Sequence, residues 1–341
     1  MHASIAGIEY VLPEQALTTA SLAAEFPDWD VEKIDSKTGI HTRPVAAPDQ
    51  CASDLAELAA RKLFERGLVK PEEVDFVLFC TQTPDHFLPP SACLLQHRLG
   101  IPVTAGAFDF NLGSSGYVYG LGLAEGLIAT GQATTILLLT GDTYSKFIHP
   151  KDKSVRTIFG DSGTATLVRA VEQPALGPFL YGTDGRGGPN LTVPAGAMRQ
   201  PHSPETAREY GDDSGNVRSL DNLYMNGAEI FTFTLQAVPA SVNGLLAKAG
   251  LTADEIDLFV FHQPNRYMLE HLRKKMKLPA EKVPVTIEHC ANTVSGSVPI
   301  VLKHAGLDGK LQPGSRILLA GFGVGYSWGA TLLRWNQLAT V

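Results

Sequence analysis

Phe108-Asp-Phe-Asn-Leu-Gly-Ser-Ser-Gly-Tyr117 joins a short apolar run to a set of small residues and then to a long apolar segment. Residues 108–112 have the pattern of a buried strand, and residues 113–116 favour a tight turn. The apolar residues that follow have helical spacing, which places Ser114 just before the first turn of a helix. Unpaired backbone N–H groups and the positive end of the helix dipole stabilise a developing anion there. A serine at such a position caps a helix or acts as a nucleophile.

The composition of the whole chain is that of a large globular protein. Its 341 residues are 44% hydrophobic and 18% charged, enough to bury one large core or two. The four cysteines have no CxxC spacing, which favours a reducing, cytoplasmic setting. No apolar run reaches the roughly 18 residues of a membrane span. A formal net charge of -7 argues against nucleic-acid binding. We therefore expect a cytoplasmic protein that binds neither membrane nor nucleic acid.

Helix-like and strand-like segments alternate along most of the chain, which indicates an α/β fold. Residues 52–66 form the clearest amphipathic pattern, with Leu55, Leu58, Ala59 and Leu63 on one stripe. Residues 74–80 and 135–140 have the composition of buried strands. Between about 182 and 222 the chain is rich in glycine, proline and charge. We expect this excursion to cover the mouth of a pocket.

Two segments of the chain resemble each other. Glu73-Val-Asp-Phe-Val-Leu-Phe-Cys-Thr-Gln82 is similar to Glu255-Ile-Asp-Leu-Phe-Val-Phe-His-Gln263, and each leads into a helix and then a strand. A repeat of this length predicts one fold built from two similar halves rather than a solenoid. We place the halves at residues 1–172 and 173–341.

Two such halves would stack their buried sheets between layers of helices, so that equivalent strand ends meet at one place. Ser114 lies in the turn of small residues in the first half, and Asn292 lies in the corresponding turn of the second. His262 directly follows the repeated strand of the second half. We therefore expect Ser114, His262 and Asn292 to lie within reach of one another.

The order and spacing of several short motifs resemble the β-ketoacyl-acyl-carrier-protein synthase III family of thiolase-fold condensing enzymes. The similarity runs from about Ile5 to Trp335. The matching segments are Thr38-Gly-Ile40, Asp109 to Gly116, Ile158-Phe-Gly-Asp161, His262-Gln-Pro-Asn265, Asn292-Thr293 with Ser297-Val-Pro299, and Gly321-Phe-Gly-Val-Gly-Tyr-Ser-Trp-Gly329. Each motif alone is weak, whereas their shared order is specific. The resemblance implies a thiolase-like fold with layers in the order α-β-α-β-α.

The family resemblance also implies a reaction. An acyl group would move from a coenzyme A or acyl-carrier-protein thioester to residue 114, and a decarboxylative condensation with a malonyl thioester would follow. Ser114, His262 and Asn292 would be catalytic, and the N–H groups of Ser114 and Val324 would form an oxyanion hole. The thioesters are substrates, so no cofactor and no metal are expected. The product would enter fatty acid or polyketide biosynthesis.

One position departs from the family, whose nucleophile is a cysteine where this chain has Ser114. A thiol beside a histidine and a helix N-terminus ionises readily, whereas a hydroxyl needs a general base at the moment of attack. An oxygen ester is also less reactive than a thioester toward a carbon nucleophile. Three interpretations stay open: a natural serine acyltransferase that makes an ester or amide without condensation, a condensing enzyme disabled by engineered replacement of its cysteine, and a non-catalytic carrier-protein-binding subunit.

Two protein partners follow from the same resemblance. Leu88 falls in a loop that, in the family, reaches across a dimer, so we expect a homodimer whose acyl pocket is partly lined by the partner's Leu88. The helix after His262 carries the basic side chains Arg266, Arg273, Lys274 and Lys275. On a chain of net negative charge, two interpretations of this cluster stay open: a docking surface that steers an acidic acyl carrier protein, and a solvated helix face.

Overall fold

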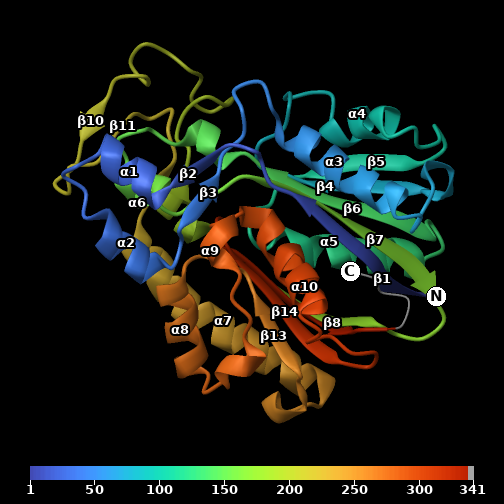
Figure 1. The fold of residues 1–341 in the computed structure, drawn as a ribbon. Coiled ribbons are helices and arrows are strands. Elements are labelled where there is room, and N and C mark those ends of the chain that lie inside the picture. Colours follow the sequence, from blue (N-terminus) through green and yellow to red (C-terminus); the bar gives the residue numbers. More distant parts are fainter. Residues whose placement is uncertain (337–341) are drawn as a thin grey trace.

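Two β-sheets form the centre of the computed structural model, which describes residues 1–336 (Figure 1). The first sheet has the strand order β1-β7-β6-β4-β5. Its strands are β1 (His2–Val11), β4 (Phe76–Cys80), β5 (Gly106–Phe110), β6 (Thr135–Asp142) and β7 (Ser162–Val171). β4 runs parallel to β5 and β6, whereas β7 is antiparallel to β1 and β6. β4 and β6 are buried almost throughout, as their continuous apolar sequences predict.

The second sheet has the strand order β13-β14-β15-β8. Its strands are β8 (Leu176–Thr183), β13 (Leu258–Phe261), β14 (Arg316–Gly323) and β15 (Ser327–Arg334). The β13–β14 pair is parallel, and β15 is antiparallel to both of its neighbours. The first sheet uses strands up to residue 171, and the second uses strands from residue 176 onward. This distribution supports a division into two halves near residue 172, which stays a prediction.

Helices form three layers around the two sheets. α5 (Gly116–Ala129) and α10 (Ser297–Leu307) lie between the sheets and contact strands of both. α3 (Ala52–Glu65) and α4 (Ser91–Arg98) pack on the first sheet, and α7 (Gly227–Ala249) with α8 (Arg266–Lys275) covers the second (Figure 1). The layers therefore follow the order α-β-α-β-α, which confirms the expected fold class.

α5 is apolar on nearly all sides because a sheet flanks it on each side. Val118, Leu121 and Ala124 are fully buried in a core cluster that also contains side chains from both sheets. A helix that is hydrophobic all round is stable only in such a buried position. The N-terminus of α5, directly after Ser114, is thereby held at the junction of the two sheets.

Short elements surround this core. They are α1 (Thr19–Glu25), α2 (Val31–Thr38), α6 (Lys153–Arg156), α9 (Ile287–Cys290), β2 (Ala16–Thr18), β3 (Thr42–Pro44), β9 (Leu191–Thr192), β10 (Tyr210–Gly211), β11 (Val217–Arg218) and β12 (Tyr224–Met225). The excursion at about 182–222 contains β9 to β11 and is anchored by a buried arginine. Arg218 donates to Asp152 (2.6 Å) and Asp212 (2.8 Å), so the excursion is docked on the core.

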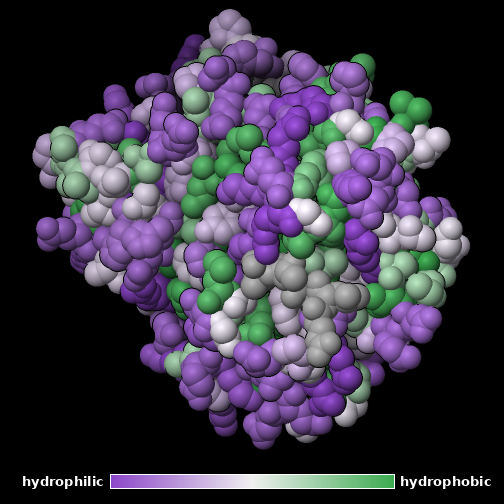
Figure 2. Space-filling view, turned by 45° about the vertical axis from the view of Figure 1, so that its right-hand side comes forward, coloured by the Kyte–Doolittle hydropathy of each residue, from purple (hydrophilic) through white to green (hydrophobic). Residues whose placement is uncertain are grey.

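α7 is long and apolar enough, by length and composition alone, to cross a membrane. Its apolar side chains are instead used inside the protein: Ile230, Phe233, Val238 and Leu245 are buried in the core cluster next to the second sheet. The face of the molecule in Figure 2 is dominated by hydrophilic residues, with hydrophobic ones in small patches. α7 is therefore a core helix of this fold.

Candidate active site

Ser114, His262 and Asn292 line one buried cavity of about 120 Å³. Their exposed fractions are 8%, 3% and 5%. Ser114 lies in the turn between β5 and α5, His262 at the end of β13, and Asn292 in the turn after α9. The structure thus brings together three residues that the sequence predicts to be neighbours. Apolar side chains make up most of the remaining wall: Ile158, Phe159, Leu191, Met225, Ile230, Met268, Val294, Phe322 and Val324.

The turn that carries Ser114 leaves its hydroxyl free of helix capping. Ser115, not Ser114, is the N-cap residue of α5, and its hydroxyl bonds to the hydroxyl of Ser327 (2.8 Å). The turn is closed by a hydrogen bond from the Gly116 N–H to the carbonyl oxygen of Gly113 (2.8 Å). Ser114 therefore faces the cavity immediately before the positive end of a 14-residue helix.

Two backbone N–H groups are available beside Ser114. Within residues 1–336, neither the Ser114 N–H nor the Val324 N–H has a hydrogen-bond acceptor in the protein. Val324 lines the same cavity, directly after the end of β14. Unpaired N–H groups in a buried site are costly unless a ligand accepts from them. They are therefore suited to hold a carbonyl oxygen that becomes an anion.

β14 reaches the nucleophile turn so closely that only glycine fits at Gly321. A Cβ atom at this position would lie 2.4 Å from the carbonyl oxygen of Ser114 and 2.9 Å from the Cα of Ser115. Both are backbone atoms, which cannot swing aside as a side chain can. The glycine-rich sequence 321–325 thus allows the two halves of the chain to meet at the site.

His262 is held at the floor of the cavity by its backbone and by its ring. Its N–H donates to the carbonyl oxygen of Ala320 (2.8 Å), and its Nδ1 lies 2.7 Å from the hydroxyl of Ser297. The ring of Phe322 meets it edge to face, with 5.4 Å between ring centres. Burial in these surroundings lowers the pKa of His262 to about 3. The imidazole is therefore neutral at physiological pH.

The bond to Ser297 leaves Nε2 of His262 as the atom directed to the cavity. A hydroxyl can donate to Nδ1 or accept from it, so both neutral tautomers of His262 are compatible with this contact. In one tautomer Nε2 accepts a proton, and in the other it donates a hydrogen bond. Ser297, at the start of α10, thus orients the ring.

Asn292 lies in a strained turn that fixes its side chain. Ala291 and Val294 on either side have φ angles of +59° and +52°, a region that a β-branched residue such as valine rarely adopts. The side-chain oxygen of Asn292 accepts from the N–H of Val294 (3.0 Å). The NH₂ group of Asn292 is thereby left to donate into the cavity. Such strain is commonly found at functional sites.

A buried carboxylate connects the two halves behind the cavity. Asp142, at the end of β6, accepts from the N–H of Gln82 (2.8 Å) and from the N–H (3.2 Å) and hydroxyl of Ser295. Burial raises the pKa of Asp142 to about 7, while these donors favour the carboxylate. Ser295 belongs to the turn of Asn292, so Asp142 ties that turn to the first sheet. The sequence alone does not identify Asp142 or Ser297 in these roles. For Asp142, the signal that could have identified it is its position at the end of a buried strand.

Leu88 lies outside the cavity of its own chain. It is 80% exposed, and the neighbouring Phe87 is 75% exposed. The excursion, in contrast, contributes Leu191 to the cavity wall. An exposed pair of large apolar side chains on one loop is typical of a contact surface.

The predicted basic cluster on α8 is only partly free. Arg266 is paired with Glu288 (2.6 Å), and Arg273 is paired with Glu270 (2.8 Å) and also donates to the carbonyl oxygen of Leu278. Lys274 and Lys275 are exposed. Among residues 1–336, no group of three or more histidine, cysteine, aspartate or glutamate side chains is placed to hold a metal ion.

Solved structures with a similar fold identify the class of protein. A crystal structure named 3-oxoacyl-(acyl-carrier-protein) synthase III has a TM-score of 0.97 and 57% identity, covering 98% of this chain and 100% of that one. A 3-oxoacyl-(acyl-carrier protein) synthase from Burkholderia xenovorans LB400 has a TM-score of 0.91 and 37% identity, covering 98% and 95%. The protein is thus a thiolase-fold condensing enzyme.

The sequence comparisons define the family more narrowly. Residues 108–185 match the family 3-oxoacyl-[acyl-carrier-protein (ACP)] synthase III, and residues 246–335 match its C-terminal family. A β-ketoacyl-[acyl-carrier-protein] synthase III of Caldanaerobacter subterraneus subsp. tengcongensis is 36% identical over 98% of both chains. One of Xanthomonas campestris pv. campestris is 35% identical over 98% of this chain and 99% of its own. This chain belongs to the β-ketoacyl-acyl-carrier-protein synthase III family.

Proposed function

We propose that the enzyme moves an acyl group from a thioester to Ser114 and then condenses it with a malonyl thioester. The observation that carries this proposal is the meeting of Ser114, His262 and Asn292 at one buried cavity, beside two unpaired N–H groups. The relatives that match over nearly the whole chain are named β-ketoacyl-acyl-carrier-protein synthase III. This arrangement supports both steps of the proposed reaction, acyl transfer and condensation.

In the first step, the Ser114 oxygen attacks the carbonyl carbon of the acyl thioester. The carbonyl oxygen becomes an anion that accepts from the N–H groups of Ser114 and Val324. The carbon–sulfur bond then breaks, and the released thiolate takes up the proton of the hydroxyl by way of Nε2 of His262. The products are an acyl ester on Ser114 and a free thiol.

In the second step, the malonyl carboxylate leaves as carbon dioxide, and its bonding electrons form an enolate. The enolate oxygen accepts from Nε2–H of His262 and from the NH₂ group of Asn292. The enolate carbon attacks the ester carbonyl, a carbon–carbon bond forms, and the bond to the Ser114 oxygen breaks. That oxygen takes a proton from solvent, and a β-ketoacyl thioester is released. The thioesters supply all reacting groups, so the proposal needs no cofactor.

The low pKa of His262 assigns it more strongly to the second step than to the first. A histidine with a pKa of about 3 is a good neutral hydrogen-bond donor and a weak base. A serine hydroxyl depends on its base, whereas a thiol near a helix N-terminus does not to the same degree. We therefore expect acylation of Ser114 to be slow and to limit turnover.

The acyl carrier protein is proposed to approach the face formed by α8. Lys274 and Lys275 are exposed there, and Arg266 lies near the nucleophile site on the same helix, directly after Asn265 of the cavity wall. Because Arg273 is paired with Glu270, we expect Arg273 to contribute less to carrier-protein docking than Lys274 and Lys275. A cytoplasmic location is part of the same proposal.

The test is intact-protein mass spectrometry after incubation with acyl-coenzyme A and acyl-carrier-protein donors. The native chain is run beside Ser114→Cys and Ser114→Ala. We expect an acyl adduct on the native chain that is absent in Ser114→Ala and forms faster in Ser114→Cys. Addition of malonyl-carrier protein should then discharge the adduct as a β-ketoacyl product.

Ser115→Ala is the matched control, because it removes the neighbouring hydroxyl, which does not line the cavity. It should retain the adduct. Acylation of Ser114→Ala to the native level would contradict the assignment of the nucleophile. An adduct on Ser114→Cys that malonyl-carrier protein does not discharge would contradict the condensation step.

A further inference from the structure

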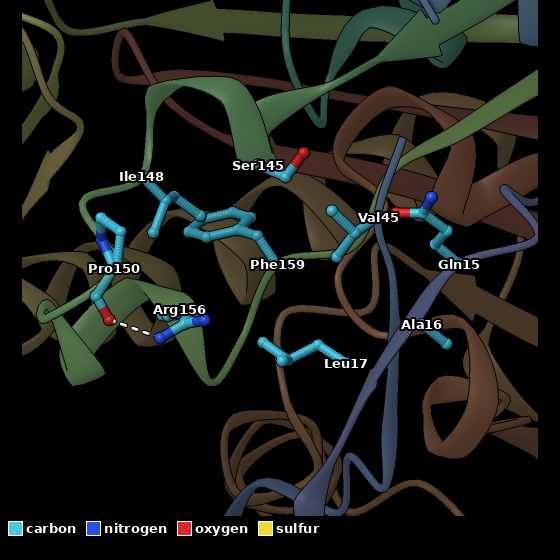
Figure 3. A pocket seen from close by; sticks show the side chains of 9 residues that line it. All are labelled: Gln15, Ala16, Leu17, Val45, Ser145, Ile148, Pro150, Arg156 and Phe159. Carbon is cyan, nitrogen blue, oxygen red and sulfur yellow. Dashed lines mark hydrogen bonds between the residues drawn. The ribbon is translucent and has the colours of Figure 1, made fainter. Parts of the chain in front are cut away.

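Phe159 borders two cavities. This residue lines the cavity of about 120 Å³ that contains Ser114 and also a second cleft of about 310 Å³. The second cleft lies between the β2–β3 region and the segment that joins β6 to α6 (Figure 3). Figure 3 shows the Phe159 ring beside Ile148, with Leu17 and Val45 on other sides of the cleft. The ring is therefore a wall between the reacting centre and this cleft.

The lining of the second cleft is mainly apolar. It consists of Ala16, Leu17, Val45, Ile148, Pro150 and Phe159, with Gln15, Ser145 and Arg156 as the polar members. Arg156 is already engaged: it donates to both carboxylate oxygens of Glu25 (3.0 and 2.9 Å) and to the carbonyl oxygen of Pro150 (2.7 Å). The cleft thus offers contacts for a hydrocarbon chain rather than for an anion.

The size of the catalytic cavity sets a narrow limit on what it can hold. An engineered apolar cavity of about 150 Å³ holds a benzene molecule. The cavity of about 120 Å³ beside Ser114 therefore has room for a short acyl group of similar bulk. A longer chain would extend beyond the cavity of one chain. The predicted dimer would border this cavity with the partner's Leu88, and within one chain Phe159 separates it from the larger apolar cleft.

The backbone of Phe159 is fixed independently of its ring. Phe159 pairs with Asn292 in a β-bridge, and the N–H of Gly160 donates to the carbonyl oxygen of Asn292 (3.0 Å). The ring itself packs against Tyr144, with 5.2 Å between ring centres. Shortening the side chain therefore removes the wall and keeps the backbone contacts that position Asn292.

Building on the proposed acyl transfer, we propose that Phe159 limits the length of the acyl chain that the enzyme accepts. The cleft lined by Leu17, Val45 and Ile148 is a latent site for the distal carbons of a longer acyl chain. Its occupant would be the hydrocarbon tail of the acyl group on residue 114, because the cleft adjoins the cavity that holds the acyl carbonyl.

The experiment measures acyl adducts by intact-protein mass spectrometry with a series of acyl-coenzyme A donors from acetyl to dodecanoyl. The native chain is compared with Phe159→Ala, each also in the Ser114→Cys background. The readout is the amount of each long-chain adduct relative to the acetyl adduct of the same protein. In Phe159→Ala we expect this ratio to rise roughly fourfold for each further methylene that is buried, until the cleft is full.

Two further variants make the test specific. Phe159→Ala combined with Leu17→Trp refills the cleft and should return the long-chain ratio toward that of the native chain. Phe64→Ala removes the same ring from a different core cluster and lines neither cavity. Phe64→Ala should show the same acyl chain-length profile as the native chain. It therefore shows how much of any change in Phe159→Ala comes only from the loss of stability that follows removal of a phenylalanine ring.

The outcomes separate this inference from the function on which it rests. Acetyl adducts in all proteins with an unchanged chain-length profile in Phe159→Ala would overturn the inference alone. A long-chain gain that persists in the Leu17→Trp double variant would also overturn it, because the tail would then lie elsewhere. Failure of every donor to acylate any Ser114→Cys protein would overturn the proposed function itself.

Discussion

His262 shows how burial selects a chemical role for a single side chain. The ring is enclosed by Phe322 and Ser297, with no carboxylate in contact with it among residues 1–336, so protonation inside the cavity is unfavourable. The same enclosure strengthens any hydrogen bond that the neutral ring donates to a developing anion. The desolvation that makes His262 a weak base therefore makes it a strong partner for an enolate.

The pKa of His262 predicts a pH dependence of stability. The folded chain binds the His262 proton with a pKa of about 3, whereas the unfolded chain binds it near 6.5. Between these values the unfolded state holds more protons, so the free energy of unfolding falls as the pH falls from 6.5 toward 3. The share due to His262 is up to about 1.4 kcal/mol per pH unit.

Urea unfolding of the native chain and of His262→Gln at pH 7.5 and pH 5 checks this prediction. The native chain should lose about 2 kcal/mol more than the variant between the two pH values. His202→Gln is the control variant, because it removes a histidine whose side chain is 68% exposed. It shows how much the pH dependence changes when an exposed histidine is replaced. If the free energy of unfolding falls equally in the native chain and in His262→Gln, then His262 has the same pKa in the folded and the unfolded state.

At the scale of single residues, the sequence predicted the side chains that line the cavity better than the residues that hold those side chains in place. Ser114, His262 and Asn292 belong to short motifs whose residue types are dictated by chemistry. Asp142 and Ser297 act through contacts with residues 153 and 35 positions away. Such contacts depend on how the two halves dock, which no local pattern contains.

At the scale of elements, β14 approaches the backbone of the turn that carries Ser114 closely at Gly321. Gly321→Ala would place a Cβ atom against the backbone of Ser114 and Ser115. We expect it to lower the free energy of unfolding by roughly 1–3 kcal/mol and to reduce acylation of residue 114 strongly. Denaturant unfolding and adduct formation measure the two effects.

Gly126→Ala is the matched control for this substitution. Gly126 lies inside α5, and a Cβ atom there would have no heavy atom within 4 Å other than its chain neighbours and the nearby backbone of its own helix. Because alanine favours helix over glycine, this variant should gain up to about 1 kcal/mol of stability. If both variants were equally stable, the close approach of β14 would not be restrictive.

The periodic patterns predicted elements well where one face of the element is buried. The helix expected at residues 52–66 is α3, Ala52–Glu65, and Leu55, Ala59 and Leu63 are fully buried. Leu58, expected on the same stripe, is 46% exposed. It lies on the edge of the helix face, where the neighbouring buried positions are occupied by small alanines. The ordered parts of the excursion had no such periodicity, because buried ion pairs hold it rather than an apolar stripe.

At the scale of the whole molecule, a homodimer is predicted from two unpaired surfaces. β5 is an edge strand of the first sheet, and the loop after β4 exposes Phe87 and Leu88. A second copy would cover both, because edge strands pair readily and exposed apolar pairs seek a partner. Analytical ultracentrifugation should give twice the chain mass of 36.6 kDa.

Replacing both loop residues, Phe87→Ser with Leu88→Ser, should weaken the dimer roughly tenfold or more and lower acyl adduct formation. Leu307→Ser is the control, since Leu307 is also an exposed leucine (62%) but lies at the end of α10. A native chain that sediments at the monomer mass would refute the predicted dimer. If the native chain is a dimer but the loop variant forms acyl adducts at the native level, the partner's Leu88 does not line the acyl pocket.

The position of the cavity between the two halves also has an evolutionary consequence. In the proposed reaction, the electrophile lies at the turn before α5, and the carbanion lies at side chains that follow β13 and α9. Most of the apolar wall comes from residues after 172, such as Leu191, Met225 and Phe322. Inherited changes in the second half can therefore alter the space for the acyl group as well as the handling of the extender. We therefore expect the two specificities of the proposed reaction to change together rather than separately.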